Sequence, residues 1–237
     1  MRYIMANTRF CPNLNGSLHV GHLFTIMVNE YIAHTTGGKF YVRFDDTVWV
    51  ATKLGIKMKS ILDGQLFDLK WLDIKMDGWI LQSDIIDEVH EILKAKKFDY
   101  PEEDESKGHP TAISLNHDNS FIAYPYCPRQ TPERVVMDHM LDITHIIRGE
   151  DFLTEVSYYS YVCQKLDYPI PNFWFLPRLA SWNGDISKTT GGNTITEFRS
   201  DGYSAEELKG MIEKACLVNP PNGWNFHNMK HNPVFNI

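Results

Sequence analysis

Two histidines, His19 and His22, follow a loop rich in turn residues, and Gly21 stands between them. An apolar run precedes the loop and a helical pattern follows it, so the pair is expected where a strand passes into a helix. Backbone N–H groups at a helix start favour phosphate, imidazoles can donate to a developing negative charge, and a glycine lets a nucleotide approach the backbone. The spacing alone also fits loop histidines with ordinary partners, or half of a metal site.

A second candidate site is the loop 184–192, which carries Ser187 and Lys188 between glycines. A lysine on a flexible loop suits a mobile clamp on phosphate. An exposed lysine in a polar loop is the alternative.

The elements around the histidines predict a β-α-β unit. Apolar spacing indicates a strand over Tyr3–Phe10, a helix from Val20 to about His34 and a second strand over Lys39–Phe44. Such a crossover makes the strands parallel, and ligands bind at the carboxyl ends of parallel strands. The histidine pair would lie at that edge.

The α/β pattern continues beyond this unit, across an acidic loop at 102–108 that predicts a subdomain boundary. Ser204 and Glu207 have the spacing of a capping box. The further elements expected are helices over Ile56–Leu69, Asp84–Lys97, Phe152–Leu166 and Ala205–Leu217, strands over Ile143–Arg148 and Phe173–Leu176, and a hairpin of Ala112–Leu115 with Phe121–Tyr126.

Charge and cysteine content narrow the function classes. Lysine and arginine number 23 against 30 acidic residues, which disfavours a protein held on nucleic acid by charge alone and leaves a local basic groove open. The four cysteines form no CxxC pair, so we expect free thiols and no dedicated metal site. Without an apolar stretch of membrane-spanning length or a secretory signal, we expect a cytoplasmic protein.

Taken in order, the motifs resemble the catalytic portion of class I glutamyl-tRNA synthetases and of their short paralogue, glutamyl-queuosine-tRNA(Asp) synthetase. Ordered agreement of many short motifs is far more specific than any one of them. The resemblance implies an α/β fold with a Rossmann-like, HUP-type parallel sheet. The segments that carry it are residues 8–22, 38–47, 71–72, 82–83, 143–151, 187–188 and 198–208.

The resemblance also implies a reaction, the activation of an amino acid by ATP as an aminoacyl-adenylate. His19–His22 corresponds to the HIGH motif that stabilises the ATP phosphates, and Ser187–Lys188 to the KMSKS loop that clamps pyrophosphate. Mg²⁺ is expected to enter with ATP. The implied catalytic residues are His19, His22 and Lys188, and the implied ATP-binding residues are Gly16, Gly21, Asp151 and Ser187.

The substrate implied is an acidic amino acid, glutamate first. Arg9 and Arg148 match two arginines that face substrate carboxylates, and guanidinium groups suit bidentate carboxylate binding. Asp45 stands where the family has a glutamate for the α-ammonium group, one methylene longer. Asn13 stands where the family commonly has serine.

Three positions depart further from the family. Gln130 and Arg134 replace the Tyr and Asn that line the amino acid pocket. Arg134 indicates either a substrate with another anionic group or an ion pair with Asp138 or Glu133. Asp185 replaces the first Lys of the KMSKS-like loop, which predicts slower activation.

The expected organisation has a first catalytic half at 1–100, a reduced insertion at 101–134, a second catalytic half at 135–190 and a short helical region at 191–237 without an anticodon-binding domain. These reductions favour transfer of the amino acid to a smaller or different acceptor than a whole tRNA, such as a modified nucleoside, a nucleic acid end, a carrier protein or a metabolite, although tRNA stays open. We also expect a monomer. Two alternatives stay open: a non-catalytic paralogue that binds nucleotide, tRNA or a protein, and a nucleotidyltransferase acting on another carboxylate.

Overall fold

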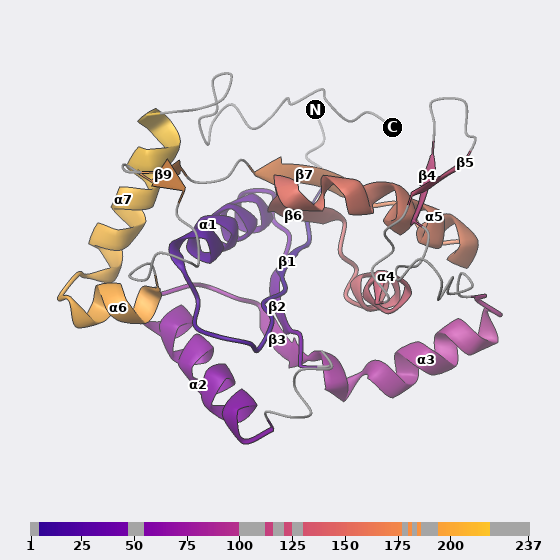
Figure 1. Cartoon of the computed structure of the whole chain (residues 1–237), viewed down its shortest axis with the longest axis horizontal. Helices are drawn as coiled ribbons and strands as arrows, with labels where there is room; N and C mark the ends of the chain where they lie inside the picture. Colours follow the sequence, from indigo (N-terminus) through magenta and orange to yellow (C-terminus); the bar gives the residue numbers. More distant parts are fainter. Residues whose placement is uncertain are drawn as a thin grey trace.

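Parallel strands run through the middle of the fold (Figure 1). β1 (Thr8–Phe10), β2 (Phe40–Phe44) and β3 (Gly78–Leu81) form one parallel sheet in that order, and β6 (His145–Gly149) pairs in parallel with β7 (Asn172–Leu176). The computed structural model describes residues 5–46, 55–99, 112–115, 121–124, 130–176, 180–181, 184–185 and 194–218.

The two parallel sheets meet between β1 and β6. The carbonyl of Asn7, just before β1, accepts hydrogen bonds from the backbone N–H groups of Thr144 at 3.0 Å and His145 at 3.1 Å. The carboxyl ends of β1, β2 and β6 therefore lie along one edge. This arrangement confirms the predicted α/β fold with a parallel sheet.

Helices cover both faces of the strands (Figure 1). Ile146 and Ile147 show the alternation, because Ile146 packs into the apolar cluster beneath α3, α4 and α5, whereas Ile147 packs into the cluster with α1. One face carries α1 (Val20–Thr35), α2 (Gly55–Trp71), α6 (Ile195–Ser200) and α7 (Ala205–Val218), and the other carries α3 (Ile86–Ala95), α4 (Thr131–Met140) and α5 (Val156–Leu166).

Shorter elements complete the described part. No helix within it is long and apolar enough to cross a bilayer. These elements are the 3-10 turns η1 (Gln82–Asp84) and η3 (Glu150–Glu155), the hairpin of β4 (Ala112–Leu115) with β5 (Phe121–Tyr124), and the pair of β8 (Ala180–Ser181) with β9 (Gly184–Asp185).

Several element boundaries differ from the sequence prediction. β1 begins at Thr8, because the backbone N–H groups of Ala6 and Asn7 donate to the hydroxyls of Thr36 and Thr144, both at 2.9 Å, instead of a strand partner. The first turn of the helix predicted from Phe152 is a 3-10 turn. The acidic loop 102–108 lies outside the described residues.

The predicted capping box is confirmed. The Ser204 N–H donates to the Glu207 carboxylate at 2.8 Å, and the Glu207 N–H donates to the Ser204 hydroxyl at 3.2 Å. The start of α7 therefore satisfies its own donors. The helices α4 and α6, in contrast, were not predicted.

Gly38 provides a test of how β1 and β2 approach each other. A Cβ atom at this position would lie 2.2 Å from the Ala6 carbonyl oxygen, so backbone would have to move. We expect Gly38→Ala to lower the free energy of unfolding by about 1–3 kcal/mol, the usual cost of overpacking.

The matched control is Gly64→Ala in α2, where a Cβ meets nothing within 4 Å. Because alanine is the better helix former, we expect this control to be neutral or stabilising by up to about 1 kcal/mol. Urea unfolding of both variants measures the difference. Equal stability of the two would contradict the close approach at Gly38.

Candidate active site

The loop that follows β1 is fixed at several points before α1 begins. The Asp45 N–H donates to the Pro12 carbonyl at 2.9 Å, and Asn13 forms a parallel bridge with Asp45. From α2, the Gln65 amide donates to the carbonyls of Asn13 at 3.1 Å and Gly16 at 2.7 Å. These contacts place Asn13 beside the buried Asp45.

The two histidines form the N-terminal cap of α1. The Nδ1 atom of His19 accepts from the N–H groups of Gly21 at 3.1 Å and His22 at 3.4 Å, and the His19 N–H faces Nδ1 of His22 at 3.3 Å. The imidazole rings stack with centroids 3.6 Å apart. Because Nδ1 accepts in both rings, the neutral tautomer assigned from these contacts carries its proton on Nε2. Each ring therefore presents an Nε2–H donor.

Gly21 allows this cap to form. A Cβ atom on residue 21 would lie 3.0 Å from Cε1 of His19, which is tighter than an ordinary contact. The glycine thus accommodates the folded-back imidazole, and its predicted contact with a nucleotide stays a prediction.

The segment that carries Ser187 and Lys188 ends beside the histidine pair. Thr194 forms an antiparallel bridge with His19, and the Ile195 N–H donates to the Leu18 carbonyl at 2.9 Å. Ser187 and Lys188 themselves lie outside the described residues, as does the side chain of Asp151 in η3.

A buried carboxylate holds Arg9. Asp138 of α4 accepts from Nε of Arg9 at 3.1 Å and from its NH2 group at 3.1 Å, and it also accepts from Arg43 at 2.8 Å. The Tyr159 hydroxyl of α5 donates to the same carboxylate at 2.8 Å. One side chain therefore joins β1, β2, α4 and α5.

This network shifts the ionisation of its members. Burial alone would raise the pKa of Asp138, but Arg9 and Arg43 outweigh burial and lower it to about 2. Burial would lower the pKa of Arg9, and Asp138 raises it above its ordinary value. Burial and the Asp138 carboxylate both raise the pKa of Tyr159. The network is thus charged at neutral pH, with Tyr159 protonated.

A second set of charged groups lies nearer to solvent. Glu155 pairs with Arg134 at 3.4 Å and with Arg148 at 3.6 Å, and the Arg148 guanidinium lies 3.1 Å from the ring centre of Phe152. Burial lowers the pKa of Arg148 to about 10, with Arg9 and Arg134 acting in the same direction. Arg9 and Arg134 are therefore close enough to Arg148 to repel its charge.

The predicted partner of Arg134 is wrong. Asp138 is occupied by Arg9 and Arg43, and Glu133 lies 3.8 Å from His90, whereas Arg134 pairs with Glu155. Glu155 could not be recognised as the partner from the sequence, because it is 21 positions from Arg134 and ends a 3-10 turn. Gln130 precedes Arg134 by one turn and is the N-cap residue of α4.

The structure therefore gathers most of the predicted site residues at the carboxyl edge of the strands. Arg9, Asp45 and Arg148 come from β1, the end of β2 and β6, and Arg134 comes from the first turn of α4. His19 and His22 lie at the start of the helix that follows β1. Their roles toward ATP and an amino acid stay predictions.

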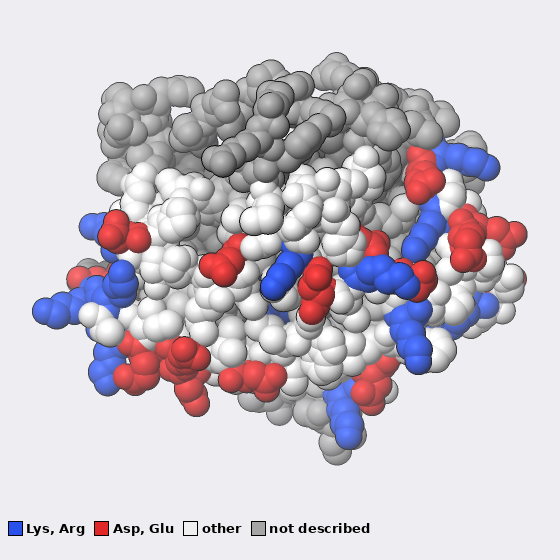
Figure 2. Space-filling view, turned by 180° about the vertical axis from the view of Figure 1, so that it is seen from behind, with Lys and Arg blue, Asp and Glu red and all other residues white. Residues whose placement is uncertain are grey.

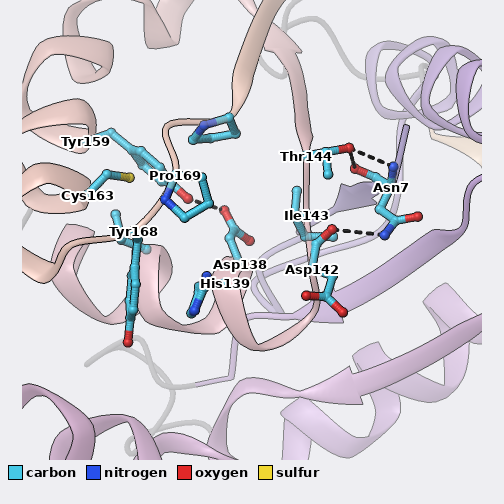
Figure 3. Close-up of a pocket in the computed structure, with 12 residues that line it drawn as sticks. Asn7, Asp138, His139, Asp142, Ile143, Thr144, Tyr159, Cys163, Tyr168 and Pro169 are labelled. Atoms are coloured by element: carbon cyan, nitrogen blue, oxygen red, sulfur yellow. Dashed lines mark hydrogen bonds between the residues drawn. The ribbon is translucent and has the colours of Figure 1, made fainter. Parts of the chain in front are cut away.

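A cavity of about 280 Å³ is lined in part by Asp138 (Figure 3). Its walls include Tyr159 and Cys163 of α5, with Tyr168 after that helix, and Thr144 at the amino end of β6. Because it opens beside the amino end of β6, this cavity is separate from the edge that carries the histidines.

The charged surface in Figure 2 is mixed. On this face, the described Lys and Arg side chains lie among Asp and Glu side chains, without a continuous basic surface. In the part of the chain that the structure covers, no group of three His, Cys, Asp or Glu side chains is placed to hold a metal ion.

The Asp138 network predicts a specific acid sensitivity. The native pKa of about 2 lies below the usual aspartate pKa of about 3.9, so the stabilisation is present above pH 4 and is lost as the pH falls from about 4 to about 2. Asp138→Asn should lower the free energy of unfolding at pH 7 by about 3–5 kcal/mol, because two buried guanidinium groups lose their carboxylate.

Denaturant unfolding between pH 2 and pH 7 measures this effect. The wild type should lose stability over the stated interval, and the difference from the variant should shrink there. Asp73→Asn, which removes an exposed carboxylate paired with Lys75, is the control and should change stability little. A pH-independent difference between wild type and Asp138→Asn would contradict the assignment.

Comparison with known proteins agrees with this geometry. Residues 5–95 and 123–218 match the family model for the catalytic domain of class I tRNA synthetases (E and Q). Glutamate–tRNA ligase 2 of Neorickettsia sennetsu is 26% identical over 224 residues, which cover 85% of this chain and 53% of that protein. Glutamate–tRNA ligase of Caulobacter vibrioides is 25% identical over 265 residues, covering 87% and 55%. The chain thus spans about half the length of the curated relatives it matches.

Solved structures share the fold. The crystal structure of a glutamate tRNA ligase from Elizabethkingia meningosepticum in complex with its amino acid superposes with a TM-score of 0.67 at 18% identity, covering 88% of this chain and 60% of that one. Tyrosyl-tRNA synthetase from Archaeoglobus fulgidus gives a TM-score of 0.53 at 16% identity, covering 81% and 61%. The Rossmann-like architecture and the family match together show that the chain belongs to the class I tRNA synthetase family of the glutamate and glutamine type, over its catalytic domain.

Proposed function

We propose that this protein activates an acidic amino acid, glutamate first, by joining it to the adenylate of ATP. The observation that carries the proposal is the gathering of Arg9, Arg134 and Arg148 at the strand edge of a class I synthetase catalytic domain. Guanidinium groups bind carboxylates in bidentate geometry. An arginine-rich pocket beside a helix start that presents imidazole donors fits a substrate with carboxylates and a second substrate with phosphates.

The proposed step is an in-line displacement at phosphorus. An oxygen of the amino acid α-carboxylate attacks the α-phosphorus of ATP, a new C–O–P linkage forms, and the bond from the α-phosphorus to the bridging oxygen breaks. Pyrophosphate leaves with that bonding pair, and no protein nucleophile takes part. Catalysis then rests on positioning and on stabilising negative charge.

The described residues have clear places in this scheme. The Nε2–H groups of His19 and His22 donate to phosphate oxygens, next to the backbone of Gly16 and Gly21. Lys188 and Ser187 would hold the leaving pyrophosphate, and Asp151 would contact the nucleotide; these roles rest on the family motif. Mg²⁺ enters with the phosphates of ATP and offsets their charge.

The amino acid would lie between the arginines and the end of β2. In this proposal Arg148 contacts a carboxylate of the amino acid, and Asp45 takes its ammonium group. The backbone of Asn13 bridges to that of Asp45, and Gln130 lies one turn before Arg134, so we assign both residues to the same site. Because Arg9 already binds Asp138 through two of its nitrogens, we assign it a positioning role and give the main carboxylate contact to Arg148.

For the acceptor we propose a molecule smaller than a whole tRNA, such as a modified nucleoside. Two observations support this choice. The family match breaks between residues 95 and 123, which overlaps the insertion that the resemblance to glutamyl-tRNA synthetases implies to be reduced in this chain. The face in Figure 2 has mixed charge over its described part, which offers phosphates no continuous basic track.

The first test is ATP–pyrophosphate exchange with each standard amino acid. We expect exchange with glutamate or aspartate without added tRNA, and we expect His22→Ala to lower kcat/KM by about 10²–10³-fold, the usual effect of removing one donor to a developing charge. His34→Ala is the matched control, because His34 lies in the last turn of the same helix and pairs with the exposed Asp77.

The outcomes separate the three candidate functions. Exchange that depends on an amino acid supports the proposal. Adenylation of a carboxylate that lacks an α-amine supports a nucleotidyltransferase. ATP binding without any exchange, unchanged in His22→Ala, supports a non-catalytic paralogue and contradicts the proposal.

The second test concerns the acceptor. Radiolabelled glutamate, ATP and total tRNA are incubated with the protein, and acid-precipitable label is counted. The proposal expects no stable label on tRNA and continued release of AMP when a competent small acceptor is added. Stable labelling of bulk tRNA would contradict the acceptor assignment while leaving the activation step intact.

A further inference from the structure

Glu155 lies beside Arg134 and Arg148, and its side chain does not cap the helix that follows it. It is the N-cap residue of α5, yet its side chain makes no capping hydrogen bond. Its carboxylate instead lies 3.4 Å from Arg134 and 3.6 Å from Arg148. The carboxylate is therefore committed to the two guanidinium groups.

The accessible arginines are Arg134 and Arg148. Their side chains are each 25% exposed, whereas those of Arg9 and Arg43 are 5% and 2% exposed and are held by Asp138. An incoming anion therefore meets Arg134 and Arg148 first. With Glu155 between them, these three side chains have a formal charge of +1.

A net charge of +1 suits one carboxylate. Without Glu155, two guanidinium groups side by side would carry +2 and would favour a dianion such as a phosphomonoester, which has a charge of about −1.5 to −2 at pH 7. Like charges in a partly buried site also oppose each other: burial lowers the pKa of Arg148 most, Arg9 and Arg134 lower it further, and Glu155 raises it.

We propose that Glu155 is the specificity-determining residue of this pocket: it offsets the charge of Arg134, so that the site selects an amino acid with a single side-chain carboxylate over one with a dianionic side chain. This inference rests on the proposed function and names its substrate class. It also explains how the site accommodates Arg134, which departs from the family pattern: Glu155 balances the additional positive charge within the protein.

Calorimetric titration with glutamate and with O-phosphoserine tests the inference by direct binding. The wild type should bind glutamate more tightly than O-phosphoserine. Glu155→Gln keeps the size of the side chain and removes its charge, and it should shift the ratio of the two dissociation constants toward O-phosphoserine by about tenfold or more. The double variant Arg134→Gln/Glu155→Gln should restore the wild-type ratio.

Glu91→Gln is the matched control, since it removes the same charge from an exposed pair with Lys94 and should leave the ratio unchanged. Thermal unfolding of each variant checks that the fold is retained. An unchanged ratio in Glu155→Gln, tighter binding of O-phosphoserine by the wild type, or no binding of either amino acid would each overturn the inference. Discrimination in binding without pyrophosphate exchange would uphold the role of Glu155 and reject the proposed function instead.

Discussion

The carboxylate of Asp138 is the constraint on which the catalytic edge depends. It accepts hydrogen bonds from Arg9, Arg43 and Tyr159, and so connects two strands with two helices of the opposite layer. Two guanidinium groups in an apolar layer would be costly without an anion. Asp138 makes their burial possible and fixes the direction of Arg9. The buried part of the arginine cluster is therefore held in place, and the charged groups nearer to solvent are Arg134, Arg148 and Glu155.

At the start of α1, one set of hydrogen bonds both caps the helix and orients the two histidines. His19 and His22 satisfy the first N–H groups of the helix with their Nδ1 atoms, so the same contacts that cap the helix also orient both rings and set their tautomers. Preorganised donors cost little reorganisation when charge develops. Thr194, six residues after Lys188, forms a bridge with His19 at this helix start.

Local patterns in the sequence were sufficient for the first β-α-β unit, where apolar periodicity and turn residues agree, and for the capping box at Ser204 and Glu207. The helix α4 was missed because its inward positions include Glu133 and Asp138, so its apolar pattern is interrupted by the charges that the site requires. Arg9, Asp45 and Arg148 lie in or directly after the strands, and Arg134 lies in the first turn of α4, while their roles toward an amino acid stay predictions. Their ion pairs could not be predicted, because each one joins residues that are distant in sequence and depends on helix packing.

In the proposed reaction, one site of the protein binds an acidic amino acid and the adenylate of ATP together. Calorimetric titration of the wild-type protein with a non-hydrolysable glutamyl-adenylate analogue, compared with glutamate alone and AMP alone, tests this binding. Because an enzyme binds a reactive intermediate more tightly than its separate parts, we expect one analogue per chain and a dissociation constant at least about 10²-fold below that of either part. Binding of the analogue no tighter than AMP would show that the two parts do not share one site.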